Sequence, residues 1–410
     1  MNLQELNKKV SDQAFSDKNF DVDSVYEITA RLAFPRLVGS DGEKKAIKVV
    51  SEEFKNAGYN PIYKDDFQTS LFVWVVLRYA FIPTSICLIL LALSFYINPW
   101  LTLGIILLNI YICAKILGLA TSSKTRLFKK EEKNFTTQNI YTCLKSKNSK
   151  AKVIFMGHWD SKSQTFPSNV RAVLFIVSLF SFIAIIILYF VFSIIRLIFP
   201  FNNLILNNVM LNICITIGLI SNFSYFNKTE NNSPGAFDNA AAVGVIIELA
   251  RYFKNNPLEN IDFIFLSPSS EELNLAGAKD FIQNHKNEFD KKSTFFINLD
   301  PVGGKELIRL ITSYGIPRRS SSEKLNTLFL NSANKLNIKV KDIYLPTGMW
   351  SDFMPIVQEG FKACWLGSQP GLKYVHTKKD NMALVSKEGI KNILLLCVDV
   401  VNEINNELNL

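Results

Sequence analysis

The chain has 410 residues, and its 45 Lys and Arg exceed its 36 Asp and Glu to give a formal net charge of +9. Hydrophobic residues make up 48% of it, a share near the average for globular proteins. The sequence has no zinc-finger spacing, no basic helix and no aromatic platform for single strands, which excludes nucleic acid as a partner. Its six cysteines form no Cys-x-x-Cys pair and indicate no disulfide framework, which agrees with a reducing compartment.

Apolar residues are unevenly distributed along the chain. Charged residues occur throughout 1–70 and 228–410 but are almost absent from 72–120 and 170–226. A membrane-spanning helix needs about 20 mostly apolar residues, and short turns join the candidate segments in pairs. The sequence therefore predicts an integral membrane protein with two helical hairpins, rather than buried core helices of a soluble protein. The four expected transmembrane segments are Tyr79–Ile97, Trp100–Ala120, Val173–Ile195 and Leu204–Phe226.

The charges that flank these segments predict the orientation. Each hairpin returns the chain to the side from which it came, so all charged segments are expected to share one side of the bilayer. That side carries most of the flanking positive charge, and the positive-inside rule places it in the cytoplasm. Residues 1–30 are polar, so we expect no signal peptide. The flanking residues are Arg78, Lys115, Lys124, Arg126, Lys129, Lys130, Arg171 and Lys228 on that side, and Arg196 on the other.

The remaining sequence predicts one α/β domain that the hairpins interrupt. Apolar residues at spacings of three and four predict two helices within 21–57, the second closed by Gly58. Further along the chain, helical patterns alternate with short apolar strands, which is typical of a largely parallel, mixed sheet flanked by helices. The expected strands are 60–67, 139–144, 152–156, 261–267 and 294–299, and the later helices are 239–254 and 273–284. The expected organisation is domain parts at 1–70, 121–169 and 227–410, with hairpins at 71–120 and 170–226.

Candidate ligands follow three of these strands. His158 comes after 152–156, Glu271 and Glu272 after 261–267, and Asp300 after 294–299. Ligands gather at the carboxyl ends of parallel strands, so we expect these side chains to meet. His285 differs from them, because it has polar neighbours and follows no strand.

The residue types at these positions suit zinc. Zinc binds imidazole nitrogen and carboxylate oxygen, and two ions about 3.5–4 Å apart can act on both the attacking and the departing oxygen. Asp238 suits a bridging position because it precedes a helix that can fix its backbone. Each residue alone has an ordinary structural explanation, such as a surface pair or a helix cap. Only their ordered combination indicates a two-metal hydrolytic site.

That combination resembles the co-catalytic dizinc exopeptidases, which include bacterial leucyl aminopeptidases, glutamate carboxypeptidases and glutaminyl cyclases. The resemblance covers 21–67, 139–165 and 232–405 and leaves the apolar segments unexplained. It implies a phosphorylase/hydrolase-like zinc exopeptidase domain. The matching motifs are GHWDS from Gly157, PGAFDNAAAVG from Pro234, SSEELNLAGA from Ser269, NLDPVG from Asn298 and YVHTKKDN from Tyr374, with further matches at 37–42 and 351–360.

The resemblance also implies a role for each residue. His158 and Asp300 would bind one zinc, Glu272 and His376 the other, and Asp238 would bridge the two. Glu271 would be the general base, and Asp160 would fix the tautomer of His158. The chain departs from the usual pattern at Phe353, where relatives often have a histidine that is not a ligand. We expect that change to alter the pocket but not metal binding.

The sequence favours an aminopeptidase that acts on peptides, among them hydrophobic or membrane-associated ones. A glutaminyl-cyclase-like transferase and an inactive membrane receptor or scaffold are the alternatives. The ligand types also accept cobalt or manganese. The sequence leaves open the preferred terminal residue, the choice between amino- and carboxypeptidase, the oligomeric state, and whether the hairpins anchor the site or also deliver its substrate from the lipid bilayer.

Overall fold

The computed structural model describes residues 20–121, 134–305, 307–346, 349–368 and 373–409. Residues 1–19 of the polar N-terminus and the basic run 124–130 lie outside the described residues. The chain divides into two compact units. The sheet unit comprises 1–69, 134–163 and 230–410, and the helical unit comprises 70–133 and 164–229.

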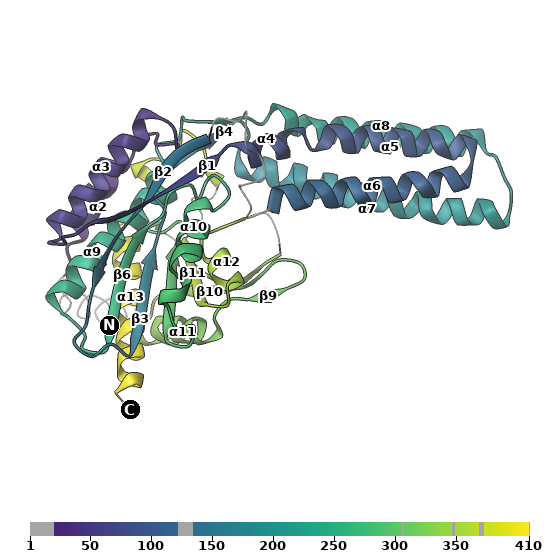
Figure 1. Cartoon of the computed structure of the whole chain (residues 1–410). Helices are drawn as coiled ribbons and strands as arrows, with labels where there is room; N and C mark the ends of the chain where they lie inside the picture. Colours follow the sequence, from purple (N-terminus) through teal and green to yellow (C-terminus); the bar gives the residue numbers. More distant parts are fainter. Residues whose placement is uncertain (1–19, 122–133, 306, 347–348, 369–372, 410) are drawn as a thin grey trace, which may run out of the picture. The chain divides into compact units, whose positions relative to one another are not determined.

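A mixed sheet forms the centre of the sheet unit (Figure 1). Strands β6, β3, β7 and β11 run parallel, β2 is antiparallel to β6, and β8 is antiparallel to β11 and parallel to β10. The predicted α/β class with a mostly parallel sheet is therefore confirmed. In spatial order the strands are β1 (Tyr63–Ser70), β2 (Asn134–Leu144), β6 (Ile261–Ser267), β3 (Ala151–Met156), β7 (Thr294–Leu299), β11 (Lys362–Ser368), β8 (Ile308–Tyr314) and β10 (Val340–Leu345), with β9 (Arg319–Ser320) beside β8 and a separate pair of β4 (Ser163–Gln164) and β5 (Thr229–Glu230).

Helices cover both faces of this sheet because its central strands are apolar on both sides. On one face Phe253 of α9 (Ala241–Asn255) stacks against Phe155 and Phe263. On the other, Phe281 of α10 (Ala276–His285) and Phe353 of α12 (Phe353–Gln358) join one apolar core with the sheet. Alternate residues of each strand thus bury into opposite layers. The remaining helices are α2 (Val22–Leu32), α3 (Asp41–Asn56), α11 (Glu323–Leu336) and α13 (Lys387–Leu408), with α2, α3 and α13 packed on α9 and α11 packed on α13.

The predicted elements are present, but two helices start later than expected. Helix α10 starts at Ala276 rather than 273, because Asn274 and Leu275 adopt left-handed backbone angles, with φ of 74° and 58°. Helix α9 starts at Ala241 rather than 239, because Asp238 and Asn239 belong to a preceding turn, η3 (Ala236–Ala240), in which their own angles are not helical. Gly58 closes α3 with φ of 87°, as its position predicts.

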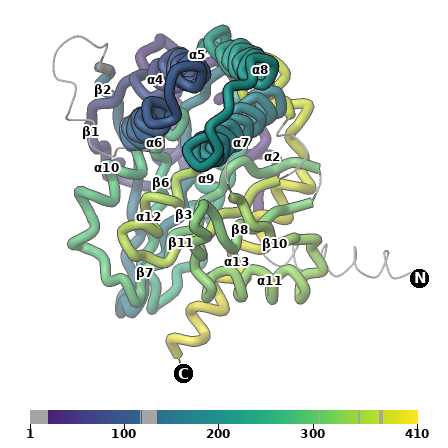
Figure 2. Tube along the Cα trace, turned by 90° about the vertical axis from the view of Figure 1, so that its right-hand side faces the viewer, coloured from purple at the N-terminus to yellow at the C-terminus, as the bar shows by residue number. Residues whose placement is uncertain are grey.

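The helical unit is a bundle of four long apolar helices. Figure 2 shows α5 beside both α6 and α8, with α7 completing the ring, and the packing of these helices agrees. Its core contains Leu91, Phe95, Tyr189 and Cys214. The four long helices are α5 (Phe81–Ile97), α6 (Pro99–Thr121), α7 (Ser168–Ile198) and α8 (Leu204–Asn222). The short helix α4 (Phe72–Tyr79) precedes α5, and η2 (Phe223–Phe226) follows α8.

Most of the apolar surface of this bundle points outward. The spans Phe72–Ile97, Pro99–Ile116, Ser168–Ile198 and Leu204–Phe226 are each long and apolar enough to cross a membrane. Only 17% of the most apolar window is buried in the second and third spans. A water-soluble bundle would bury its apolar faces and expose polar ones. The four helices are therefore candidate membrane spans, as the sequence predicts.

His285 is a structural residue at the edge of the sheet unit. Its Nε2 lies 2.8 Å from Asp65 Oδ2 on β1, and its Nδ1 lies 3.0 Å from Glu288 Oε1. The hydrogen bond to Asp65 raises the pKa of His285, and burial opposes this rise. Protonated His285 therefore links β1 to the end of α10.

We predict that this link makes stability depend on pH. A histidine whose pKa is higher in the folded chain stabilises the fold below its unfolded pKa of about 6.5, and this contribution is lost as pH rises through the folded pKa. The gap in thermal midpoint between the wild type and His285→Gln should therefore be largest near pH 6 and shrink towards pH 8.5. Thermal unfolding followed by tryptophan emission measures it, with Glu288→Gln at the exposed partner as a control of smaller effect. A gap that stays constant across this range would contradict the prediction.

Candidate metal centre

The strand register brings the predicted ligands to one edge of the sheet. Met156 at the end of β3 pairs with Leu266 of β6 and with Asn298 of β7, so the three strands end side by side. From these ends the chain continues into His158, into Glu271 and Glu272, and into Asp300. The parallel strand β11 lies beside β7 and precedes the segment of His376. The predicted convergence at the carboxyl ends of the strands is observed.

Gly157 allows β3 to end against its neighbours. A Cβ atom at this position would lie 2.9 Å from Ala242 Cβ, 3.0 Å from Ile246 Cδ1 and 3.2 Å from Leu299 O. Any side chain here would push β3 away from α9 or from β7. The glycine therefore sets how closely His158 approaches α9 and the turn η3 before it, where Asp238 lies.

The first cluster of candidate ligands contains His158, Asp238 and Asp300. His158 Nε2 lies 3.1 Å from Asp238 Oδ1 and 3.5 Å from Asp300 Oδ1. All three residues are buried, with His158 only 1% exposed. One ligand atom from each lies within 4.8 Å of the others.

The second cluster contains Asp238, Glu272 and His376. His376 Nε2 lies 3.0 Å from Glu272 Oε2 and 3.3 Å from Asp238 Oδ2. Asp238 therefore belongs to both clusters and presents a different carboxylate oxygen to each histidine. That is the geometry expected of a carboxylate shared by two cations.

The turn that carries Asp238 is fixed from several sides. Gly235 has φ of 57°, and a Cβ atom there would lie 2.6 Å from both Asp238 O and Ser161 Cβ. The amides of Phe237 and Asp238 donate to the carboxylate of Asp380 at 2.7 and 3.2 Å. The turn is thus held in a conformation that a continuous helix could not adopt.

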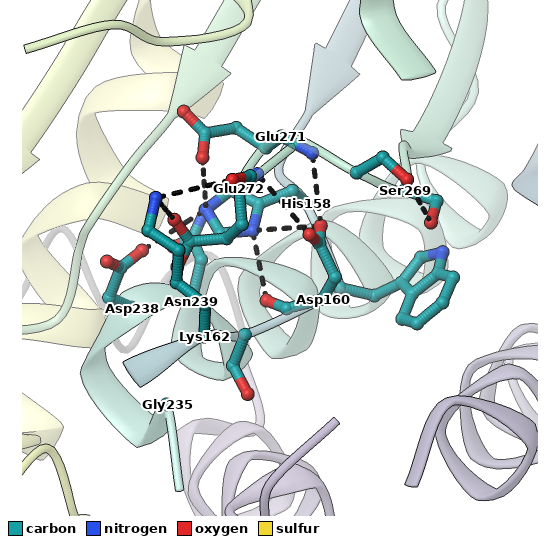
Figure 3. Close-up of polar contacts among 12 residues, drawn as sticks. His158, Asp160, Lys162, Gly235, Asp238, Asn239, Ser269, Glu271 and Glu272 are labelled. Atoms are coloured by element: carbon teal, nitrogen blue, oxygen red, sulfur yellow. Dashed lines mark hydrogen bonds and ion pairs between the residues drawn. The ribbon is translucent and has the colours of Figure 1, made fainter. Parts of the chain in front are cut away.

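Asp160 and Glu271 lie beside the clusters without belonging to either. His158 Nδ1 lies 3.1 Å from the backbone oxygen of Asp160 and 3.4 Å from its carboxylate (Figure 3). The two carboxylate oxygens of Asp160 accept from the amides of Glu271 and Glu272 at 3.2 and 3.3 Å. Glu271 Oε2 lies 3.9 Å from His158 Nε2. Asp160 therefore joins the strand end of His158 to that of the two glutamates.

Buried groups of opposite charge decide where protons reside in this site. Burial disfavours the charge on Asp238, but hydrogen bonds from His158 and His376 outweigh it and hold the pKa of Asp238 below its usual range. Burial also disfavours the charge on His158, yet its bonds to Asp160 and Asp238 raise its pKa well above the usual value. For Glu271 burial prevails and raises the pKa well above its usual range. The carboxylates of the clusters thus stabilise a positive charge placed among them. Glu271 binds a proton more strongly than a solvated glutamate does.

The donor set fits zinc. Each cluster offers one imidazole nitrogen and two carboxylate oxygens, which are ligand types that zinc binds in catalytic sites with a position left for water. Both clusters are enclosed by protein and concentrate negative charge that a divalent cation would balance. Among the described residues, these two clusters are the groups of histidine, cysteine and carboxylate side chains close enough to hold a metal.

Several residues of the site escape prediction from the sequence. Lys162 is buried with its Nζ 2.6 Å from Glu272 Oε2, and the Ser351 hydroxyl donates to Asp300 Oδ2. Asn298 in turn donates to Ser351 at 2.7 Å. Lys162 could have been noticed as a charged residue directly after the GHWDS motif, and Ser351 as part of the 351–360 match. Phe353, where relatives often have a histidine, packs in the core against Tyr314.

A hollow of mixed polarity lies beside the segment that contains Ser351. It has a volume of about 220 Å³. Trp350 and Met349, which directly precede Ser351, line it together with Met354 and with the polar side chains of Arg319 and Gln358. None of the residues of the two clusters lines it, but it adjoins in sequence Ser351, whose hydroxyl donates to Asp300.

Comparisons with known proteins agree with the fold and the motifs. Residues 223–401 match the family described as peptidase family M28. A stretch of 177 residues is 26% identical to aminopeptidase YwaD of Bacillus subtilis, covering 39% of this chain and 35% of that protein. The match thus spans about a third of the curated relative's length.

Solved structures share the fold at low sequence identity. BSAP, a zinc aminopeptidase from Bacillus subtilis, superposes with a TM-score of 0.54 at 15% identity, covering 94% of this chain and 95% of that one. A glutaminyl cyclase from an Acidobacteriales bacterium gives 0.55 at 13% identity, with coverages of 95% and 96%. The match of residues 223–401 to peptidase family M28 thus confirms the resemblance of the chain to the co-catalytic zinc exopeptidase family.

Proposed function

We propose that the protein is a zinc-dependent aminopeptidase with a two-metal site. The observation that carries the proposal is the shared carboxylate of Asp238, whose two oxygens lie 3.1 and 3.3 Å from His158 and His376. His158, Asp238 and Asp300 would hold one zinc, and Asp238, Glu272 and His376 the other. The family match and the aminopeptidase relative support peptide hydrolysis.

Zinc at these positions supplies Lewis acidity, polarising a peptide carbonyl and lowering the pKa of water. Glu271 then acts as the general base. Its carboxylate takes a proton from the water that attacks the scissile carbonyl carbon, and it returns that proton to the nitrogen of the departing amine as the C–N bond breaks. Asp160 orients His158 through Nδ1, which leaves Nε2 facing the clusters. The burial that strengthens proton binding at Glu271 suits it to both transfers.

The hollow that adjoins Ser351 in sequence suggests which peptides the site prefers. Met349, Trp350 and Met354 offer apolar surface beside the polar groups of Arg319 and Gln358, and a hollow of about 220 Å³ accommodates a large aliphatic or aromatic side chain. We infer that substrates with a hydrophobic residue beside the scissile bond are favoured. Membrane-associated peptides are rich in such residues.

Replacing the proposed base should abolish catalysis but not metal binding. Glu271→Gln keeps the shape of the side chain and removes its proton acceptor, so kcat on a leucyl chromogenic substrate should fall by a factor of about 10² to 10⁴. Zinc content, measured by elemental analysis, should stay at the wild-type value of two per chain because Glu271 belongs to neither cluster. The matched control is Glu259→Gln, which changes an exposed glutamate before the opposite end of β6. Activity that persists in Glu271→Gln would overturn the assignment of the base.

The same assay separates the alternative activities. A glutaminyl-cyclase-like transferase would release ammonia from a peptide with N-terminal glutamine and leave the leucyl substrate intact. A receptor or scaffold would do neither, although it could retain zinc. Hydrolysis of the leucyl substrate that is lost on zinc removal and restored by zinc supports the aminopeptidase.

We further propose that the helical unit spans the membrane as two hairpins inserted in one zinc-binding domain. Support comes from the outward-facing apolar side chains of α5 to α8 and from the position of both hairpins within the sequence of the sheet unit. Positive residues such as Arg78 and Arg171 flank the hairpins on the side of the sheet-unit segments, and only Arg196 lies near the opposite turns. By the positive-inside rule the zinc-binding domain is cytoplasmic.

Two single cysteine replacements test this topology. Asn202→Cys lies in the turn between α7 and α8, and Lys147→Cys lies in the exposed turn between β2 and β3. A membrane-impermeant maleimide added to intact cells should label the first variant, whereas the second should be labelled only after permeabilisation. The wild type, with its six native cysteines, gives the background. The reverse labelling pattern would place the zinc-binding domain outside.

A further inference from the structure

Arg36 is a fully buried charge behind the candidate metal centre. It follows α2, and its side chain is 0% exposed. Within the described part of the chain, its guanidinium forms no ion pair and donates instead to backbone carbonyls. Burial lowers its pKa to about 10, and the charge of Asp380 is the largest influence that opposes the shift. Burying a charged side chain is costly, so its contacts with these carbonyls point to a role that a neutral side chain could not fill.

The acceptors of this guanidinium belong to three separate segments. Arg36 Nη1 donates to Leu32 O at 2.8 Å, at the end of α2, and to Pro234 O at 2.6 Å. Nη2 donates to Gly235 O at 2.7 Å, and Nε donates to Trp159 O. Trp159 follows His158, and Gly235 lies three residues before Asp238. One side chain thus ties the segment of the first histidine to the turn of the shared carboxylate.

Asp380 binds the backbone amides of the same turn, whereas Arg36 binds its backbone carbonyls. Its carboxylate accepts from the amides of Phe237 and Asp238, whereas Arg36 donates to the carbonyls of Pro234 and Gly235. Asp380 also lies four residues after His376, so it links the turn to the segment of the second histidine. Ser161 adds a further tie, because its hydroxyl accepts from Arg36 N at 3.2 Å and donates to Ser233 O at 3.2 Å.

We propose that Arg36 is a positioning residue that, opposite Asp380, sets the distance between His158 and Asp238 and thereby the affinity of the metal centre. The planar guanidinium directs its donors to acceptors in fixed directions, and a lysine ammonium cannot reproduce this fork. Its charge also interacts favourably with the negative charges of Asp160, Asp238 and Glu272. The inference rests on the proposed zinc site, but it concerns the framework of that site and not the reaction.

Arg36→Lys tests the proposal because it keeps the positive charge and removes the planar arrangement of N–H donors. Groups that orient metal ligands typically contribute about 10- to 100-fold to metal affinity. We expect the Kd for Zn²⁺, from chelator competition, to rise by that factor, and the visible absorption of the Co²⁺-loaded chain to change in intensity. Arg31→Lys is the control, since Arg31 lies on α2 itself and pairs with Glu52 and Glu53 instead of with the carbonyls behind the candidate site.

The outcomes distinguish this proposal from the proposed function. A wild-type chain that binds neither metal contradicts the zinc site itself. Wild-type binding of two ions, with the same Kd and Co²⁺ spectrum in Arg36→Lys, overturns the positioning role alone. A purely structural role would lower the thermal midpoint of the metal-free chain and leave the Co²⁺ spectrum unchanged.

If Arg36→Lys fails to fold, Asp380→Asn provides the test from the other side of the turn. Asparagine keeps one acceptor oxygen in place of two, so one of the amides of Phe237 and Asp238 loses its partner. The Co²⁺ spectrum and the Zn²⁺ Kd should change in the same direction as expected for Arg36→Lys. An unchanged spectrum and Kd in a folded Asp380→Asn chain would overturn the proposal.

Discussion

The shared carboxylate of Asp238 is the constraint around which the sheet unit is organised. Its two oxygens face two histidines that are more than 200 residues apart in sequence. Holding both contacts requires the end of β3, the turn before α9 and the segment after β11 to meet at one point. Each has a specific means of doing so: Gly157 allows the close approach, Gly235 allows the turn, and Asp380 ties the turn to the segment of His376.

Buried charge has a different role in the two units. The sheet unit encloses carboxylates, histidines, Lys162 and Arg36 at the end of its sheet, and most of these groups have partners of opposite polarity. Leaving such groups unpaired in a protein interior costs several kcal/mol, so the network restricts the site to few arrangements. The bundle core instead contains apolar side chains with a few hydroxyl and thiol groups, such as Tyr189 and Cys214. One unit is specified by polar contacts and the other by apolar packing.

The sequence predicts the position of the site better than its framework. Short apolar strands followed by His158, Glu271 and Asp300 are local patterns, and parallel strands bring their ends together, so the convergence could be foreseen. The late start of α10 could not, because Leu275 has no intrinsic preference for its left-handed backbone, which is imposed by the surrounding fold. Arg36 has no local signal for its role either, since its acceptors Trp159 O and Pro234 O lie in segments about 120 and 200 residues away. Long-range polar contacts of this kind depend on the completed fold.

The place of the hairpins in the chain fixes the order in which the sheet can form. Strand β3 lies between β6 and β7, yet both of these follow the second hairpin in sequence. During synthesis β1, β2 and β3 leave the ribosome without their central partners, and all four apolar helices must be made before β6 exists. His158 is likewise made before any of the carboxylates of its cluster. Neither candidate cluster can therefore form until both hairpins have been synthesised, and a chain that stops within either hairpin lacks Asp238 and every ligand that follows it.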